Sequence, residues 1–139
     1  MMRCGKRVGL ALMLAWCHLC GLAQPLKALA YVGWWQPQSW QSVPLHEMER
    51  LFFFELQVDA SGAVSERHGW PEQWQDLQAA AKAHRVPVDL TLTLFDSGTF
   101  NRLFASDQAI AKLLADCLEL ARPQGVSGLH FDFEIYKLI

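Results

Sequence analysis

Apolar runs and helix-like amphipathic segments alternate along the chain from residue 28 onward. Runs rich in β-branched and aromatic residues are typical of buried strands, whereas apolar residues spaced three and four apart indicate a helix. The runs predict four strands, at residues 28–35, 51–58, 86–95 and 126–136. The periodic segments predict two helices, one over residues 70–85 and one that Ser106 caps and Pro123 ends.

This order of elements predicts βα units, with a parallel sheet and helices packed outside it. Two architectures fit, a doubly wound sheet and a (β/α) barrel. No glycine-rich phosphate-binding loop follows any strand, which removes the rationale for the doubly wound sheet. We therefore expect an α/β fold of the (β/α)8 TIM-barrel type. A complete barrel takes about 250 residues, so 139 residues predict a barrel truncated after its fourth strand, a half barrel.

The first 23 residues have the pattern of a secretory signal peptide. Three basic residues precede an apolar run of about 16 residues, which is shorter than the roughly 20 residues that a membrane-spanning helix needs. Small residues at Gly21 and Ala23 predict cleavage before Gln24. A second candidate site after Ala30 would remove the start of the first strand. We expect an exported protein, periplasmic or extracellular, with residues 24–139 as its domain, and a retained anchor is the alternative.

Composition and charge exclude several classes of function. The chain is 52% hydrophobic and 19% charged, as expected of a globular domain. Without residues 1–23, which carry three basic residues and no acid, the net charge is -5, so we expect no nucleic-acid partner and no membrane contact after cleavage. Only Cys117 then remains, at an apolar position of the second helix, where we expect a small buried side chain. No cysteine or histidine spacing resembles a metal site, and we expect no metal or cofactor.

The last predicted strand separates into two different faces. Its period of two places apolar side chains on one face and a polar set on the other: Gly128, His130, Asp132, Glu134 and Tyr136. In a barrel the polar face would line the interior. Buried ionisable side chains are costly unless they serve each other or a ligand, so this face is the candidate site. An antiparallel strand with a solvated polar face is the alternative interpretation.

The segment from Ser127 to Glu134 resembles the Asp-Gly-x-Asp-x-Asp-x-Glu signature of glycoside hydrolase family 18, the chitinase-like enzymes. Residues 30–40, 56–64 and 104–125 are similar to the family's first strand and loop, its second strand end, and the helix before its catalytic strand. The resemblance implies a TIM barrel and a polysaccharide of acetamido sugars as substrate.

By position, the resemblance implies that Glu134 is the general acid and that Asp132 orients both this acid and the acetamido group of the substrate. The acetamido oxygen, and not a second carboxylate, would attack the anomeric carbon. Trp34 would stack on a sugar face, its alternative being a packed core tryptophan. His130 and Tyr136, on the face of the two acids, complete the expected substrate-binding residues.

The chain also departs from the family pattern. Ser127 and His130 stand where the signature has aspartates, and the Ser-x-Gly-Gly segment of the third strand is absent. We therefore expect an exported glycoside hydrolase-like protein, weakly active or inactive as a truncated form. The alternative function is a non-catalytic, carbohydrate-binding chitinase-like protein. The open edges of a half barrel further predict self-association.

Overall fold

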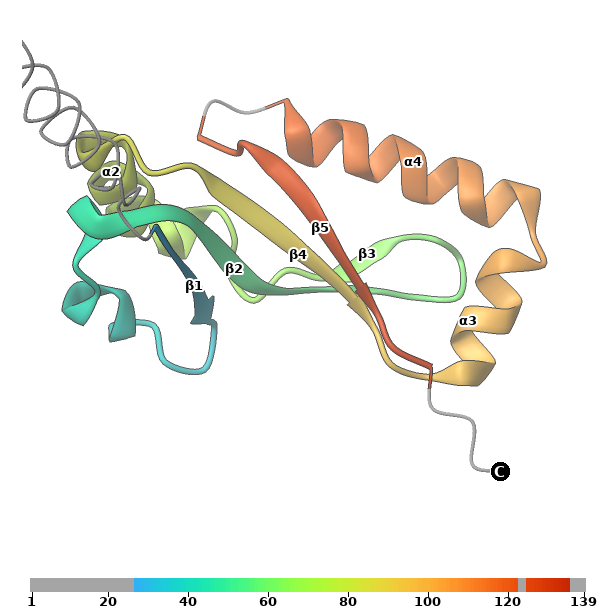
Figure 1. Cartoon of the computed structure of the whole chain (residues 1–139). Coiled ribbons are helices and arrows are strands. Elements are labelled where there is room, and N and C mark those ends of the chain that lie inside the picture. Colours follow the sequence, from blue (N-terminus) through green and yellow to red (C-terminus); the bar gives the residue numbers. More distant parts are fainter. Residues whose placement is uncertain (1–26, 123–124, 136–139) are drawn as a thin grey trace, which may run out of the picture.

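A computed structural model describes residues 27–122 and 125–135 (Figure 1). The predicted signal peptide and Tyr136 lie outside these described residues. The strands are β1 (Ala28–Gly33), β2 (Met48–Val58), β3 (Val64–Glu66), β4 (Val88–Leu94) and β5 (Gly128–Phe133). The α-helices are α2 (Gln75–His84), α3 (Ser97–Phe104) and α4 (Asp107–Ala121), and short 3-10 helices are η1 (Ser39–Ser42), η2 (Leu45–Glu47) and η3 (Glu72–Trp74).

Four strands form a parallel sheet in the order β1-β2-β4-β5, and β3 pairs antiparallel with β2. This confirms the predicted α/β class and its parallel strands. Figure 1 shows α4 running beside β5, with α3 where β4 ends. No helix within the described ranges is long and apolar enough to cross a membrane.

Strand β4 lies inside the sheet and is buried along its whole length. Alternate residues of a strand point to opposite faces. Val88, Leu90, Leu92 and Leu94 belong to the apolar core. Asp89, Thr91 and Thr93 point to the other face and are also buried. The two faces of the sheet therefore differ in chemistry: one is apolar and packs on the helices, and the other carries polar groups.

The core lies between the sheet and the helices. Phe53 of β2 is fully buried, and its ring centroid lies 4.9 Å from that of Trp70 and 4.8 Å from that of Trp74. Helix α4 contributes Cys117, which is buried as predicted. Burial, followed by the nearby charge of Asp116, raises the pKa of the Cys117 thiol above its usual value. This thiol is therefore an apolar core group and not a reactive one.

Helix ends follow local hydrogen-bonding rules. The predicted cap of α4 is confirmed, because the Ser106 hydroxyl accepts a hydrogen bond from the Ala109 N–H at 3.2 Å. Asp96 caps α3 in the same way through the Thr99 N–H. The hydrogen bonds from Thr99 lower the pKa of Asp96 below its usual value. The sequence pattern did not predict helix α3; the Asp96 cap and the burial of Leu103 explain why it forms.

The sequence also missed the hairpin between β2 and β3. The Asp59 carboxylate accepts hydrogen bonds from the N–H groups of Ser61 and Ala63, which turns the chain back so that β3 pairs with β2. Strand β2 begins at Met48, three residues before the predicted start. The first predicted helix begins with the 3-10 turn η3 and becomes an α-helix only at Gln75.

A buried carboxylate joins this hairpin to α4. Asp116 Oδ2 accepts a hydrogen bond from the Val64 N–H at 3.0 Å, and its other oxygen pairs with the ammonium of Lys112. Burial by itself would raise the pKa of Asp116, but the hydrogen bonds from Lys112 and Val64 outweigh it, and the pKa is lowered. The ionised form is therefore the one that stabilises the fold.

We predict that Asp116→Asn removes a pH-dependent part of the stability. A lowered pKa in the folded state means that the contribution is fully present above the unfolded pKa of about 4 and is lost as the pH falls through the folded value. Urea denaturation of both proteins should give a stability difference that is largest above about pH 5 and shrinks toward about pH 2. Glu119→Gln, an exposed change on the same helix, is the control. A difference that is independent of pH would contradict this role for Asp116.

A matched pair of phenylalanines tests the position of the core. Phe53 is 0% exposed and Phe131 is 50% exposed. Phe53→Ala should lower the free energy of unfolding by about 3–5 kcal/mol, because it leaves a cavity between the sheet and two tryptophans. Phe131→Ala should cost less than about 1.5 kcal/mol. Equal losses in urea denaturation would show that the apolar core lies elsewhere.

Candidate active site

All four parallel strands contribute side chains to the face of the sheet opposite the helices. The register pairs Phe54 with Thr91 and Thr91 with His130, so these residues form a row across the sheet. The next row pairs Thr93 with Asp132. Paired residues of neighbouring strands point to the same face. We call this the concave face and define it by Tyr31, Phe52, Phe54, Thr91, Thr93, His130 and Asp132.

A contact across the sheet shows the curvature of this face. Strands β1 and β5 are separated by β2 and β4, yet the Tyr31 hydroxyl lies 3.3 Å from Nδ1 of His130. The ring of Phe52 packs against both, with its centroid 5.0 Å from that of Tyr31 and 5.2 Å from that of His130. The sheet is therefore curved, and side chains from its two ends meet above its middle.

Beside this contact lies a cavity of about 570 Å³. Its lining includes the rings of Tyr31, Trp35 and Phe54 together with the carboxylate-bearing Asp132. Trp35 stands edge-on to Phe54, with ring centroids 5.9 Å apart. Apolar rings with a few convergent polar groups are typical of a small-molecule site, and aromatic faces suit the apolar faces of a ring-shaped polar ligand.

The structure brings together two of the predicted site residues, His130 and Asp132, on the concave face. Glu134 directly follows β5 and is exposed, and its N–H donates a hydrogen bond to the Leu94 carbonyl. The imidazole of His130 contacts the hydroxyl of Tyr31 on the far strand β1. The predicted roles of these residues remain predictions.

Trp34 lies away from the Asp132 cavity. Its indole stacks on the imidazole of His68, with ring centroids 4.0 Å apart and planes 2° apart. It lines a separate cavity of about 360 Å³ with Gln73 and Trp74. Trp35 is the tryptophan beside Asp132. The period-two alternation from Tyr31 through Gly33 to Trp35 is the sequence signal that could have identified it.

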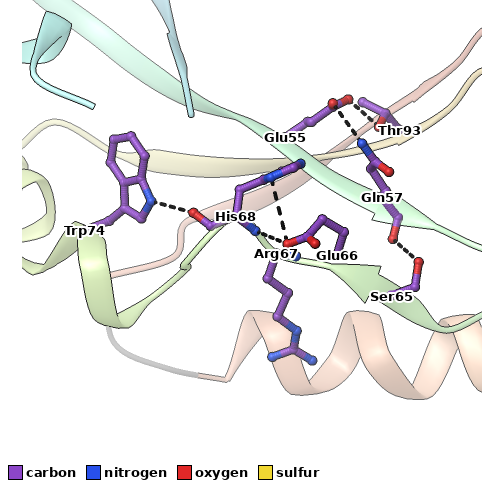
Figure 2. A network of polar contacts seen from close by, with 8 residues as sticks. All are labelled: Glu55, Gln57, Ser65, Glu66, Arg67, His68, Trp74 and Thr93. Carbon is purple, nitrogen blue, oxygen red and sulfur yellow. Dashed lines mark hydrogen bonds and ion pairs between the residues drawn. The ribbon is translucent and has the colours of Figure 1, made fainter. Parts of the chain in front are cut away.

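The loop after β3 holds His68 in place. Figure 2 shows the Glu66 carboxylate receiving the backbone N–H of His68, at 2.7 Å, and it also accepts the N–H of Arg67, at 2.8 Å. These two bonds lower the pKa of Glu66 below its usual value. The carbonyl of His68 in turn accepts a hydrogen bond from the Trp74 indole at 3.0 Å. Hydrogen bonds to both the N–H and the carbonyl of His68 therefore hold its backbone in place, and with it the imidazole that stacks on Trp34.

Glu55 is a concave-face residue that the sequence did not predict. Between Phe54 and Leu56 the β2–β4 register shifts, so Glu55 has no partner on β4. Such a bulge redirects a side chain, and Glu55 Oε2 accepts a hydrogen bond from the Thr93 hydroxyl at 2.5 Å (Figure 2). Its other oxygen accepts one from the Gln57 amide at 3.3 Å. The sequence signal that could have identified Glu55 is an acidic residue within an otherwise apolar segment of the strand.

The amino-terminal end of the same face contains an ion pair. Arg50 of β2 donates a hydrogen bond to Asp89 of β4 at 2.5 Å. Within residues 27–122 and 125–135, no group of three or more histidine, cysteine, aspartate or glutamate residues could hold a metal ion.

No known protein-family model matches the chain, and no curated protein matches its sequence. Solved structures do resemble its fold. A chitinase from Bacteroides thetaiotaomicron superposes with a TM-score of 0.67 at 17% identity, over 81% of this chain and 37% of that one. A class V chitinase from Pseudomonas fluorescens Pf-5 has a TM-score of 0.65 at 18% identity, over 78% and 35%.

The spore cortex-lytic enzyme SleL of Bacillus cereus is also similar, with a TM-score of 0.62 at 16% identity, over 78% of this chain and 28% of that one. At these identities the likeness shows the fold. The chain has the parallel α/β fold of part of these chitinases and of SleL, and it spans only 28% to 37% of the length of these three structures.

Proposed function

We propose that the chain carries the catalytic strand of an exported glycoside hydrolase that cleaves polysaccharides of acetamido sugars. The observation that carries this proposal is the placement of Asp132 on the concave face, beside a cavity lined by Tyr31, Trp35 and Phe54. The fold similarity to chitinases supports it. The family 18 assignment and export rest on the sequence segments 127–134 and 1–23.

In this proposal two carboxyl groups divide the work. Glu134 gives its proton to the glycosidic oxygen as the bond to the anomeric carbon breaks. The acetamido oxygen of the same sugar forms a new bond to that carbon, with Asp132 holding the acetamido N–H. A water molecule then attacks the anomeric carbon and displaces the acetamido oxygen, which re-forms the acetamido group. Glu134 takes a proton from this water, which restores the acid. Tyr136, Trp34 and His130 remain proposed sugar-binding residues.

We propose low turnover for the chain as it stands, because it spans about a third of the length of the similar enzymes. In a half barrel, β1 and β5 would be open edges. Phe131, on β5 and 50% exposed, would then be available for self-association.

A second candidate function is a non-catalytic carbohydrate-binding protein. The observation that favours it is the contact of His130, which stands where the family signature has an aspartate, with the hydroxyl of Tyr31. Both candidates use the same cavity and differ only in whether Glu134 transfers a proton.

Hydrolysis of a chromogenic N-acetylglucosamine oligomer separates the two candidates. The chain should release the chromophore, and Glu134→Gln should slow the release by at least about 100-fold, because an amide cannot act as the general acid. Binding of the uncleaved oligomer, measured by calorimetry, should stay within about twofold.

Glu119→Gln is the matched control, because it removes an exposed carboxylate from α4. Equal release by wild type and Glu134→Gln would refute the acid role. Binding without any release would favour the carbohydrate-binding protein. If the chain neither binds nor cleaves the oligomer, both candidate functions are wrong.

A further inference from the structure

Among the residues that the structure describes, Glu55 is the buried acid that has no cationic partner. Three acidic residues are buried among the described residues, Glu55, Asp89 and Asp116, at 8%, 8% and 7% exposure. Asp89 pairs with Arg50, and Asp116 pairs with Lys112. No lysine, arginine or histidine in the described part of the chain forms an ion pair with Glu55. A buried charge ordinarily has a counter-charge.

The hydrogen bonds of Glu55 fit an ionised carboxylate. The Thr93 hydroxyl donates to it at 2.5 Å, a length typical of a hydroxyl bound to a charged oxygen. Gln57 donates its amide to the second oxygen. Both donors are neutral, so they stabilise the negative charge without balancing it.

A second polar group on the same face is also unsatisfied. Thr91 is 0% exposed, and its hydroxyl has no hydrogen-bond partner within the described structure. It lies two residues before Thr93 on β4 and pairs in register with His130. A buried hydroxyl without a partner destabilises the folded state, because it has lost its hydrogen bonds to water. Glu55 and Thr91 thus leave an unpaired charge and an unpaired hydroxyl on one face.

The position of Glu55 relates it to the proposed catalytic site. Asp132 pairs with Thr93, whose hydroxyl binds Glu55, so the two carboxylates flank one threonine. Glu55 and Asp132 are separated by two strand spacings, or about 10 Å. A saccharide bound in the cavity beside Asp132 therefore lies within about two strand spacings of Glu55.

We propose that Glu55 binds the ammonium group of an amino sugar, so that the preferred ligand is a partly de-N-acetylated polysaccharide. The ammonium supplies the missing positive charge and three hydrogen-bond donors. One of these donors is directed to Glu55. Acetamido sugars of the same polymer occupy the Asp132 side. This inference rests on the proposed function and specifies its substrate.

Calorimetry at about pH 6, where a small amine is protonated, tests the proposal with two probes. These are the tetramer of glucosamine and the tetramer of N-acetylglucosamine. The chain should bind both. Glu55→Gln should weaken binding of the glucosamine tetramer by at least about tenfold and that of the acetylated tetramer by less than about twofold. Raising the salt concentration should weaken only the former.

Two further variants separate binding from folding. Glu55→Asp keeps the charge and should retain part of the preference for the amine. Asp116→Asn removes an equally buried carboxylate on the helix side and should leave both affinities unchanged. If Glu55→Gln does not fold, as judged by circular dichroism, the Glu55→Asp and wild-type measurements decide.

Each other outcome overturns the inference. A wild-type chain that binds only the acetylated tetramer refutes an ammonium site and leaves the proposed function standing. Displacement of the glucosamine tetramer by millimolar Mg²⁺ or Ca²⁺ would assign Glu55 to a metal ion instead. If the chain binds neither tetramer, the proposed function and this inference are both overturned.

Discussion

The pairing of β4 with both β2 and β5 is the constraint on which the rest of the structure depends. Because β4 is covered on both faces, its alternation divides the sheet into an apolar side and a polar side. Leu90 and Leu92 lie on the side that packs on the helices, and Thr91 and Thr93 lie on the other side. The same register places His130 and Asp132 on the polar side. A shift of one residue would turn both of them toward the helices.

The bulge at Glu55 shows how one strand serves both sides. Strict alternation after Phe53 and Phe54 would turn Glu55 into the apolar core beside Trp70 and Trp74. The extra residue lets Leu56 remain in the core while the carboxylate reaches Thr93. Here the register irregularity avoids burying a charge among apolar rings and supplies a charged group to the concave face.

Sequence patterns predicted what depends on local periodicity. The four parallel strands, the Ser106 cap and the two faces of β5 follow from the spacing of apolar residues. Features that depend on a partner strand or on competing hydrogen bonds were missed. The bulge at Glu55 exists only relative to β4, and α3 depends on the Asp96 cap. Trp35 could have been found by alternation from Tyr31, but the resemblance directed attention to Trp34. The functional roles of Asp132 and Glu134 came only from resemblance.

The central claim is that the concave face binds a saccharide beside Asp132. Nuclear magnetic resonance of the ¹⁵N-labelled chain, titrated with the N-acetylglucosamine tetramer, tests it most directly. The account predicts that the Trp35 indole and the backbone amides of Phe54 and Asp132 shift, while the Trp74 indole, held by the His68 carbonyl, does not. Shifts confined to the helix side of the sheet, or none at saturating tetramer, would contradict it.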